Sequence, residues 1–471
     1  MLTFAQKVWK FEAWANQTTV HPAGLSMLGL CCGLILLASR RVATLAFFLF
    51  SVFVSVNQRV VVTGLDFDFI RILVLVTLFR IVIRGELGNF KFRVQDGILI
   101  AFVVSSSIAM VVRVGVPGLE NRLGFALTSI GIYFAMRTLI RGKEDLVFLA
   151  KPLVLAMIPL TVFFMIEKAT GRNPFAFLGG VPELTVVRSG RLRCQGAFAH
   201  PIVAGVFFAM LVPYLVGISL MNSRRAAPFL AGVGMCVLII FATSSSTPVS
   251  ALILGLIGWM FWKVRWQLSS VRWLAVVLLL FLHFAMEKGV WHLLARIDFV
   301  GGSTGWHRYH LIERAIANLD EWFLIGLNST GHWGPGLYDV TNQFVLEGIN
   351  GGLVSVILLI AIIVTSFVSV SRSLRAAAGT DTAYLIFGFG VMMFVHVCVF
   401  LSLSYFGQMT LLWFFTIAAI ESLAEENSEP VGRRVNSMGR TAVNPRVVRA
   451  FDRSKPRVIR GQGSAVERGS A

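Results

Sequence analysis

Charged side chains are scarce in this chain of 471 residues: 14% are Asp, Glu, Lys or Arg, whereas 56% are hydrophobic. Soluble domains usually carry about 25% charged residues, so the composition excludes a water-soluble globular protein. The hydrophobic residues gather in long runs, such as residues 153–166, 354–370 and 411–420. Since about 20 apolar residues cross the hydrocarbon core of a bilayer, we expect a chain that crosses a membrane many times.

Cysteine is also rare, and its placement excludes a disulfide framework. Four of the five cysteines lie within apolar runs, where cysteine behaves as a small hydrophobe, and only Cys194 lies between runs. The runs themselves lack the alternation of polar and apolar residues that barrel strands show. Because lipid offers no hydrogen-bond partners to the backbone, the remaining choice is helices.

We therefore predict an all-α, polytopic membrane helix bundle of about 12–13 transmembrane helices with two long periplasmic loops. The predicted spans are residues 23–38, 42–56, 66–83, 95–112, 122–140, 145–166, 199–220, 228–243, 247–262, 272–287, 343–370, 382–402 and 405–421.

The orientation follows from the lysines and arginines of the short loops, which concentrate on the cytoplasmic side of membrane proteins. Six basic groups lie in every second loop between the predicted spans. Because every second loop lies on the same face of the membrane, these groups share one face: Arg40/Arg41, Arg84/Lys91/Arg93, Arg137/Arg141/Lys143, Arg224/Arg225, Lys263/Arg265/Arg272 and Arg372/Arg375. We expect an outer amino terminus and a cytoplasmic carboxyl terminus.

Three regions follow from these features. Residues 1–22 form an amino-terminal segment at the interface, and residues 23–421 form the transmembrane domain, with outer loops at 167–198 and 288–342. Residues 422–471 form a basic cytoplasmic tail, with nine Lys/Arg against one Asp between 433 and 460. This composition predicts disorder and contact with anionic lipid. Nucleic-acid binding is not expected, because no folded module accompanies the tail.

The first long loop carries an unexpected excess of positive charge for an outer loop. Two explanations remain: long loops tolerate outer charges, or the loop binds an anion. Arginine favours the second, since its rigid fork of donors matches phosphate oxygens. Arg188, Arg191 and Arg193 precede a span directly, at the depth of lipid headgroups. The loop's charged residues are Lys168, Arg172, Arg188, Arg191 and Arg193, against Glu167 and Glu183.

The second long loop contains a predicted amphipathic helix at 306–318 on the membrane surface, with Leu311, Ala315 and Ile316 on one side and Arg308 elsewhere.

This loop is also rich in tryptophan and histidine. Trp306, Trp322 and Trp333 suit either the membrane interface or the core of the loop. His307 and His310 have the spacing of a metal pair, but no third ligand stands at a supporting distance in sequence. We expect no metal and no cofactor.

Polar side chains also mark the start of the span at 343–370. Gln343, Glu347 and Asn350 follow helical spacing and share one face, which in lipid must point to a cavity or to another helix. Interhelical hydrogen bonding and ligand binding both explain such a face. Asp66 and Asp68 are candidate partners.

These features together resemble the O-antigen ligase and polymerase superfamily, bacterial inner-membrane glycosyltransferases that use undecaprenyl-diphosphate-linked glycans. Residues 193–205, "RCQGAFAHPIVAG", resemble the family's Arg-x-x-Gly-x-Phe-x-x-Pro entry to a span. Residues 241–258 are similar to its Thr/Ser-rich junction, with Thr247 where the family usually has Arg. Residues 308–353 look like its large outer loop and the following helix.

The resemblance implies transfer of a glycan from undecaprenyl diphosphate to a glycan or glycolipid acceptor on the periplasmic face of the bacterial inner membrane, without metal or nucleotide. Membrane lipid and polysaccharide assembly proteins are the other expected partners. By motif, Arg193 and Arg308 stabilise the departing diphosphate, and Arg188 and Arg191 help to bind it.

The acceptor hydroxyl needs a base or an orienting group. Thr341 occupies the position where the ligases have a histidine, followed by Asn342 of the same motif. This difference favours a polymerase over a ligase and leaves Asp339 as the nearest carboxylate. The remaining substrate-binding candidates are Gln343, Glu347, His310 and His332.

Two other classes stay open: a transporter or flippase of lipid-linked glycans, and a non-catalytic subunit of a polysaccharide assembly complex. Transporters often show repeats or interrupted helices at matching positions in two halves, and no such symmetry is visible in the sequence.

Overall fold

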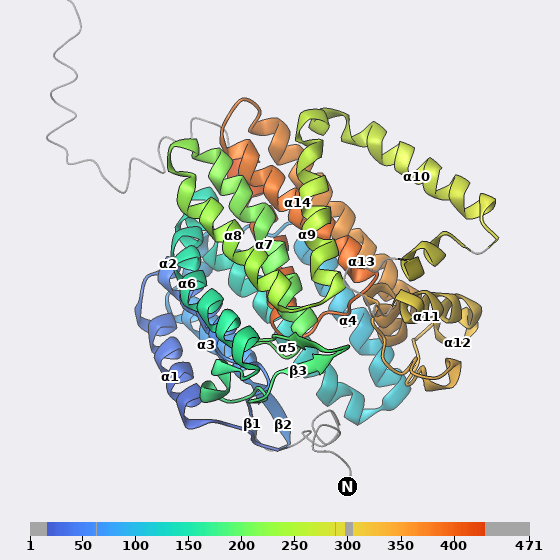
Figure 1. Cartoon of the computed structure of the whole chain (residues 1–471), viewed down its shortest axis with the longest axis horizontal. Helices are drawn as coiled ribbons and strands as arrows, with labels where there is room; N and C mark the ends of the chain where they lie inside the picture. The colour runs from blue at the N-terminus through green and yellow to red at the C-terminus, as the bar shows by residue number, and fades with distance from the viewer. Residues whose placement is uncertain (1–16, 63, 288, 297–304, 429–471) are drawn as a thin grey trace, which may run out of the picture. The chain divides into compact units, whose positions relative to one another are not determined.

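The computed structural model describes residues 17–62, 64–287, 289–296 and 305–428 (Figure 1). A helix lies at each of the thirteen predicted positions. These are α1 (Pro22–Leu37), α2 (Arg40–Phe53), α3 (Phe69–Ile83), α4 (Val94–Val114), α5 (Val116–Leu139), α6 (Lys143–Thr170), α7 (Pro201–Met221), α8 (Ala227–Ala242), α9 (Ser246–Met260), α10 (Leu268–Ala285), α13 (Gln343–Ala376), α14 (Thr382–Phe400) and α15 (Gln408–Ser428).

Length and composition support the membrane assignment. Six stretches of helix among the described residues are long and apolar enough to cross a bilayer: α4, α6, α7, α9 with its extension to Gln267, α13 and α14. The all-α membrane bundle is therefore confirmed as an architecture, while the number of spans remains a prediction.

Helix α7 lies at the centre of the bundle. Every residue from Val203 to Leu215 is buried, as expected for a helix that is apolar on all sides. Helices α8, α9 and α14 pack around it. Glycine permits the closest of these contacts, because a Cβ at Gly205 would lie 2.5 Å from Pro248.

Shorter elements connect the helices. Strand β1 (Arg59–Val62) pairs antiparallel with β2 (Leu65–Asp68), and β3 (Val186–Arg188) pairs with β4 (Arg191–Arg193). The second long loop contains α11 (Gly305–Ala317), α12 (Leu319–Trp322) and the 3₁₀ turn η8 (Gly331–Trp333). The other 3₁₀ turns are η3 (Glu86–Asn89), η4 (Pro174–Leu178), η5 (Ser223–Arg225), η6 (Phe261–Gln267) and η7 (Val290–Arg296).

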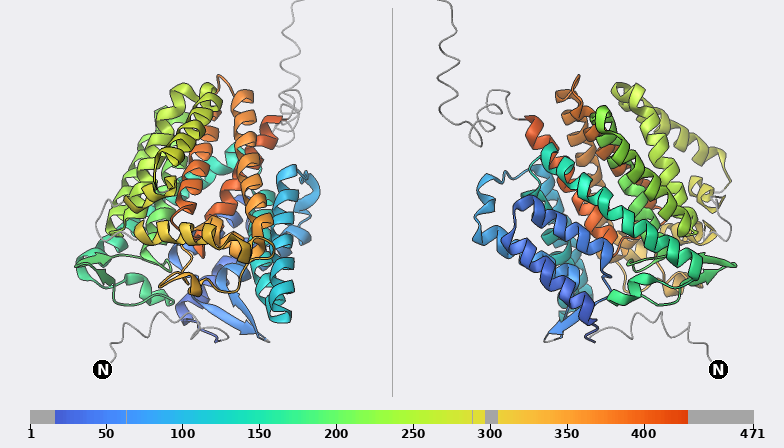
Figure 2. Two further views of the ribbon diagram at one scale, coloured as in Figure 1. Left: turned by 90° about the vertical axis from the view of Figure 1, so that its right-hand side faces the viewer. Right: turned by 60° about the vertical axis from the view of Figure 1, so that its left-hand side comes forward.

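Both long loops lie at the same end of the bundle, which we call the loop end (Figure 2). Hydrogen bonds join them to their neighbours there. Gln58 after α2 donates to the Leu178 carbonyl in the first loop at 2.9 Å, and Arg113 at the end of α4 donates to the Asn328 side chain in the second at 2.6 Å. The helices alternate in direction, so the short basic loops occupy the opposite, basic end.

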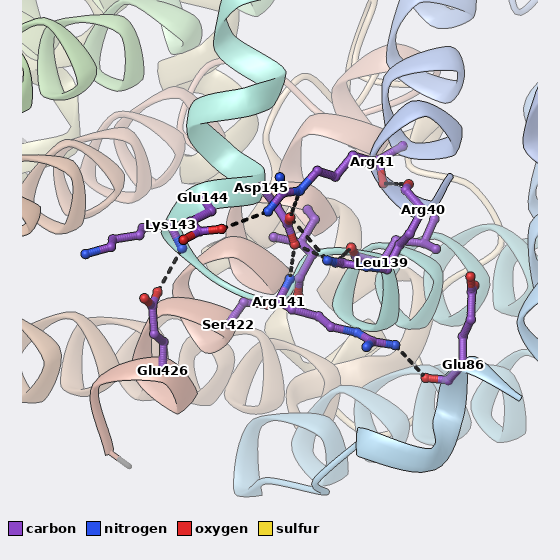
Figure 3. A network of polar contacts seen from close by, with 12 residues as sticks. Arg40, Arg41, Glu86, Leu139, Arg141, Lys143, Glu144, Asp145, Ser422 and Glu426 are labelled. Carbon is purple, nitrogen blue, oxygen red and sulfur yellow. Dashed lines mark hydrogen bonds and ion pairs between the residues drawn. The ribbon is translucent and has the colours of Figure 1, made fainter. Parts of the chain in front are cut away.

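At the basic end, buried carboxylates hold the arginines together (Figure 3). Asp145 accepts hydrogen bonds from Arg40 and Arg41, each at 2.5 Å, and from the backbone N–H of Arg141 at 2.8 Å. Glu421 of α15 forms an ion pair with Arg93 at 2.6 Å. The basic groups thus do share one end. Its assignment to the cytoplasm rests on their charge.

Two predicted boundaries were wrong. Residues 66–68 belong to strand β2 and not to the helix, because Asp68 caps α3 by accepting the Arg71 N–H at 2.8 Å. Helix α15 continues to Ser428, with Leu423 and Ala424 buried, so the tail does not begin at 422. Within the predicted amino-terminal segment, Thr19 forms an antiparallel β-bridge with Arg59 of β1. Residues 1–16 and 429–471 lie outside the described part of the chain.

Candidate functional site

Helix α13 is broken near the loop end, which the sequence analysis did not predict. Gly351 and Gly352 have non-helical dihedral angles, with φ of +70° at Gly352. The break exposes backbone groups to which the second long loop binds: Leu327 N–H donates to the Ile349 carbonyl and Leu353 N–H to the Phe323 carbonyl, both at 2.8 Å. A side chain at Gly352 would lie 2.3 Å from the Leu324 carbonyl oxygen, so the docked loop requires glycine here.

A small separate core fixes the second loop against α13. It contains Leu311, Ala315, Trp322, Trp333, Leu337 and Ile349. Trp322 and Trp333 are therefore core aromatics, whereas Trp306 is 59% exposed. The predicted amphipathic helix exists as α11, but its faces differ from the prediction. Arg308 shares the buried face with Leu311 and Ala315, and Ile316 is exposed.

The buried face of α11 brings Arg308 to the start of α9. Its Nη2 donates to Thr247 Oγ1 at 2.8 Å. Arg193, at the end of the β3–β4 hairpin, donates from Nη2 to Ser245 Oγ at 2.5 Å. One arginine from each long loop thus binds the same three-residue segment. We call Arg193 and Arg308 the arginine pair.

The arginine pair has no counter-ion among the described residues. Arg193 and Arg308 are each only 7% exposed, and the Nε atom of each is buried without a hydrogen-bond partner. Within the described ranges, no carboxylate forms an ion pair with either. Burial, with the nearby charge of Arg188, lowers the pKa of both groups below the usual arginine value. Both guanidinium groups remain charged near neutral pH, since that usual value lies far above it.

A third cation reaches the same segment from α6. Lys168 Nζ donates to Ser244 Oγ and to the Leu192 carbonyl, both at 2.7 Å. The preceding residue, Glu167, positions the loop that carries Arg193 by accepting the backbone N–H groups of Gln195 at 3.0 Å and Gly196 at 2.9 Å. Apart from the loop's charge, no sequence feature indicated these roles.

The predicted binding residues Arg188 and Arg191 face each other across the β3–β4 hairpin, whose turn is Ser189–Gly190. Both are exposed. Arg188 lies near enough to the arginine pair and to His200 to lower the pKa of each. The hairpin therefore adds positive charge to the mouth of the site.

His200 is a neutral group among these cations. It caps α7 by accepting the Ile202 N–H on Nδ1 at 3.1 Å. Burial lowers its pKa to about 4, and the charges of Arg193 and Arg188 add to this effect. Because an unfolded chain would bind the proton with a pKa of about 6.5, we expect the protein to lose stability as the pH falls from about 6.5 to 4.

His200→Asn keeps a capping side chain and removes the titration. Thermal unfolding in detergent between pH 4 and 8 is expected to show a smaller loss at low pH for this variant than for the wild type. Parallel curves for the two proteins would show that His200 titrates normally.

Three predicted residues lie away from the arginine pair. Asp339 is exposed, and its backbone carbonyl contacts His307 Nε2 at 3.1 Å. His332 binds Glu321 at 2.7 Å on the surface of the loop, and His310 lies 3.4 Å from Glu313. These positions give Asp339 no buried contact with the other candidates. No set of three His, Cys, Asp or Glu residues in the described ranges is arranged to hold a metal ion.

The polar residues at the start of α13 are buried. Asn342 caps the helix, accepting the Val345 N–H at 3.1 Å and donating to the Leu401 carbonyl at 3.4 Å. Gln343 accepts the Tyr405 N–H at 2.6 Å and donates to Glu347 at 2.6 Å. Asn342 therefore positions the helix, and Gln343 joins it to the loop at 401–407.

The partners of this polar face are not the predicted aspartates. Asp66 pairs with Arg59 at 2.6 Å and Asp68 with Arg71 at 3.5 Å. Arg122 of α5 takes their place by donating to Asn350 Oδ1 at 2.9 Å. The sequence analysis missed Arg122 because it is the first residue of a predicted span and no motif surrounds it.

Comparison with models of known protein families and with characterised proteins finds no match for this chain.

Proposed function

We propose that this chain is a membrane glycosyltransferase of surface polysaccharide biosynthesis. It transfers a glycan from an undecaprenyl-diphosphate carrier to a sugar hydroxyl on the periplasmic face of the bacterial inner membrane. Polymerisation is favoured over ligation, because Thr341 replaces the histidine of the ligases.

The observation that carries the proposal is the buried arginine pair, which has no carboxylate partner in the part of the chain that the structure describes. Removing a charged group from water costs several kcal/mol unless an opposite charge compensates. Two such groups, with Lys168 beside them, make a site that an anion would stabilise. Arginine forks match the geometry of phosphate oxygens, and a site at the loop end meets the headgroup of a lipid-linked donor.

The proposed chemistry uses this charge directly. When the acceptor oxygen attacks the anomeric carbon, the bond from that carbon to the diphosphate oxygen breaks and its electron pair stays on the diphosphate. Fixed positive donors stabilise charge that develops there, and in a site shielded from water they do so more strongly than solvent would. The arginine pair is expected to fill this role.

A transfer assay tests the proposal. Purified protein in lipid nanodiscs receives a lipid-diphosphate oligosaccharide with an acceptor glycan, and we expect a lengthened glycan together with free undecaprenyl diphosphate. Movement of the intact lipid between leaflets of a proteoliposome, with no new glycosidic bond, would instead identify a flippase. The absence of both activities would indicate a non-catalytic assembly subunit.

A further inference from the structure

A second pair of buried charged residues lies at the loop end, and its two members, on α5 and α13, have opposite charges. Glu347 is 3% exposed and Arg122 is 4% exposed. The two charges act on each other, yet among the described residues no ion pair within 4.0 Å joins them. Separate neutral neighbours hold the two side chains in place, Gln343 for Glu347 and Asn350 for Arg122.

One atom on each side of this pair has no partner. Glu347 Oε1 accepts from Gln343, whereas Oε2 is buried without a hydrogen bond. Arg122 Nη2 donates to Asn350, whereas Nε is buried without an acceptor. Leaving a buried polar atom unpaired costs about 1–3 kcal/mol, and more for a charged group. An acceptor and a donor are thus both left open, which a group with the opposite pair of functions would satisfy.

A hydroxyl is such a group, since it donates one hydrogen bond and accepts others. A phosphate does not fit, because Glu347 would repel it. The pair is also connected to the arginine pair through the loop at 401–407. Gln343 binds Tyr405 in that loop, and Gln408, which follows it, donates to the Ala197 carbonyl at 3.3 Å, four residues after Arg193.

We propose that Arg122 and Glu347 bind the acceptor hydroxyl of a sugar, with Glu347 as the general base. This inference rests on the proposed function and supplies the group that Thr341 cannot. The Nε–H of Arg122 donates a hydrogen bond to the hydroxyl oxygen, and Glu347 Oε2 accepts the hydroxyl proton.

During transfer, the acceptor O–H bond breaks and its proton moves to Glu347 Oε2, while the oxygen forms the new bond to the anomeric carbon. The bond between that carbon and the diphosphate oxygen breaks, and the diphosphate leaves with the electron pair. Glu347 then returns the proton to the departing diphosphate or to water, which restores the carboxylate.

Glu347→Gln tests the assignment because it keeps the size of the side chain and removes the base. With the purified protein in nanodiscs, we expect binding of undecaprenyl diphosphate to be retained and transfer to fall about 10²-fold, the usual contribution of a general base. Glu347→Ala is expected to lose transfer as well and to regain about tenfold of it with added formate, a small carboxylate that a purely structural role would not respond to.

Glu421→Gln is the matched control, since Glu421 is equally buried but lies at the basic end with Arg93. It is expected to lower the unfolding temperature while leaving transfer per folded protein unchanged.

Two results would overturn the assignment. Transfer by Glu347→Gln within about threefold of wild type would mean that the pair holds only water. Loss of carrier binding together with transfer, and no recovery with formate, would make Glu347 a structural residue. A wild-type protein that binds the carrier but never transfers would overturn the proposed function itself, and the base with it.

Discussion

Replacing Arg193 or Arg308 with lysine is expected to lower glycan transfer by about 10²–10³-fold, nearly as much as replacement with alanine. The reason is geometric. Each arginine uses Nη2 to bind Ser245 or Thr247, and its Nε is buried without a hydrogen-bond partner. A lysine ammonium is a single point charge that cannot bind the hydroxyl and a phosphate with the same fixed fork.

The measurement is glycan chain length or transfer yield in a deletion strain complemented with each variant, normalised to the amount of protein in the membrane. Arg172→Ala is the control, because Arg172 lies in the same loop and its side chain forms an exposed ion pair with Glu183 at 3.5 Å. Exposed pairs contribute about 0–1 kcal/mol. Full activity of Arg193→Lys and Arg308→Lys would remove both residues from the site.

Asp145→Asn is expected to destabilise the protein by about 3 kcal/mol, the lower end for breaking a buried ion pair. Asp145 accepts from Arg40, Arg41 and the Arg141 backbone at once. Without its charge, two arginines lose their shared counter-ion where α2 meets α6. The lower end applies because the side chain of Arg41 is 39% exposed. Thermal unfolding in detergent is the measurement.

Glu144→Gln is the adjacent control. Among the described residues its carboxylate binds Arg41 alone, at 3.0 Å, and its side chain is 63% exposed. Such a pair is expected to contribute well under about 1 kcal/mol. Equal shifts in unfolding temperature for the two variants would show that burial does not set the strength of these ion pairs.

The helical frame was predictable because an apolar run indicates burial in lipid or protein by its own composition, whatever residues lie elsewhere in the chain. Its errors occur where local side chains decide the boundary. Asp68 ends a strand and caps a helix through its own hydrogen bond. The break at Gly351–Gly352 depends on a loop whose Leu324, 28 residues earlier in the chain, packs against Gly352. Neither interaction leaves a periodic signal.

The candidate site was predictable only in part for the same reason. Motifs singled out Arg193 and Arg308, but nothing in their spacing shows that both reach the start of α9. Arg122 and Glu347 are separated by more than two hundred positions, and the packing of α4 against both α5 and α13 brings their helices together. Asp339 was chosen for its closeness in sequence, and the fold instead leaves it at the surface.

Binding of undecaprenyl diphosphate to the wild-type protein in nanodiscs, compared with undecaprenol, tests most directly whether the arginine pair recognises an anionic lipid headgroup. The two lipids share the same chain and differ only in the diphosphate. We predict that the diphosphate binds at least about tenfold more tightly and that this preference disappears when Arg193 and Arg308 are both alanine. Equal affinity for the two lipids, or a preference that survives the double substitution, would contradict the assignment of the pair.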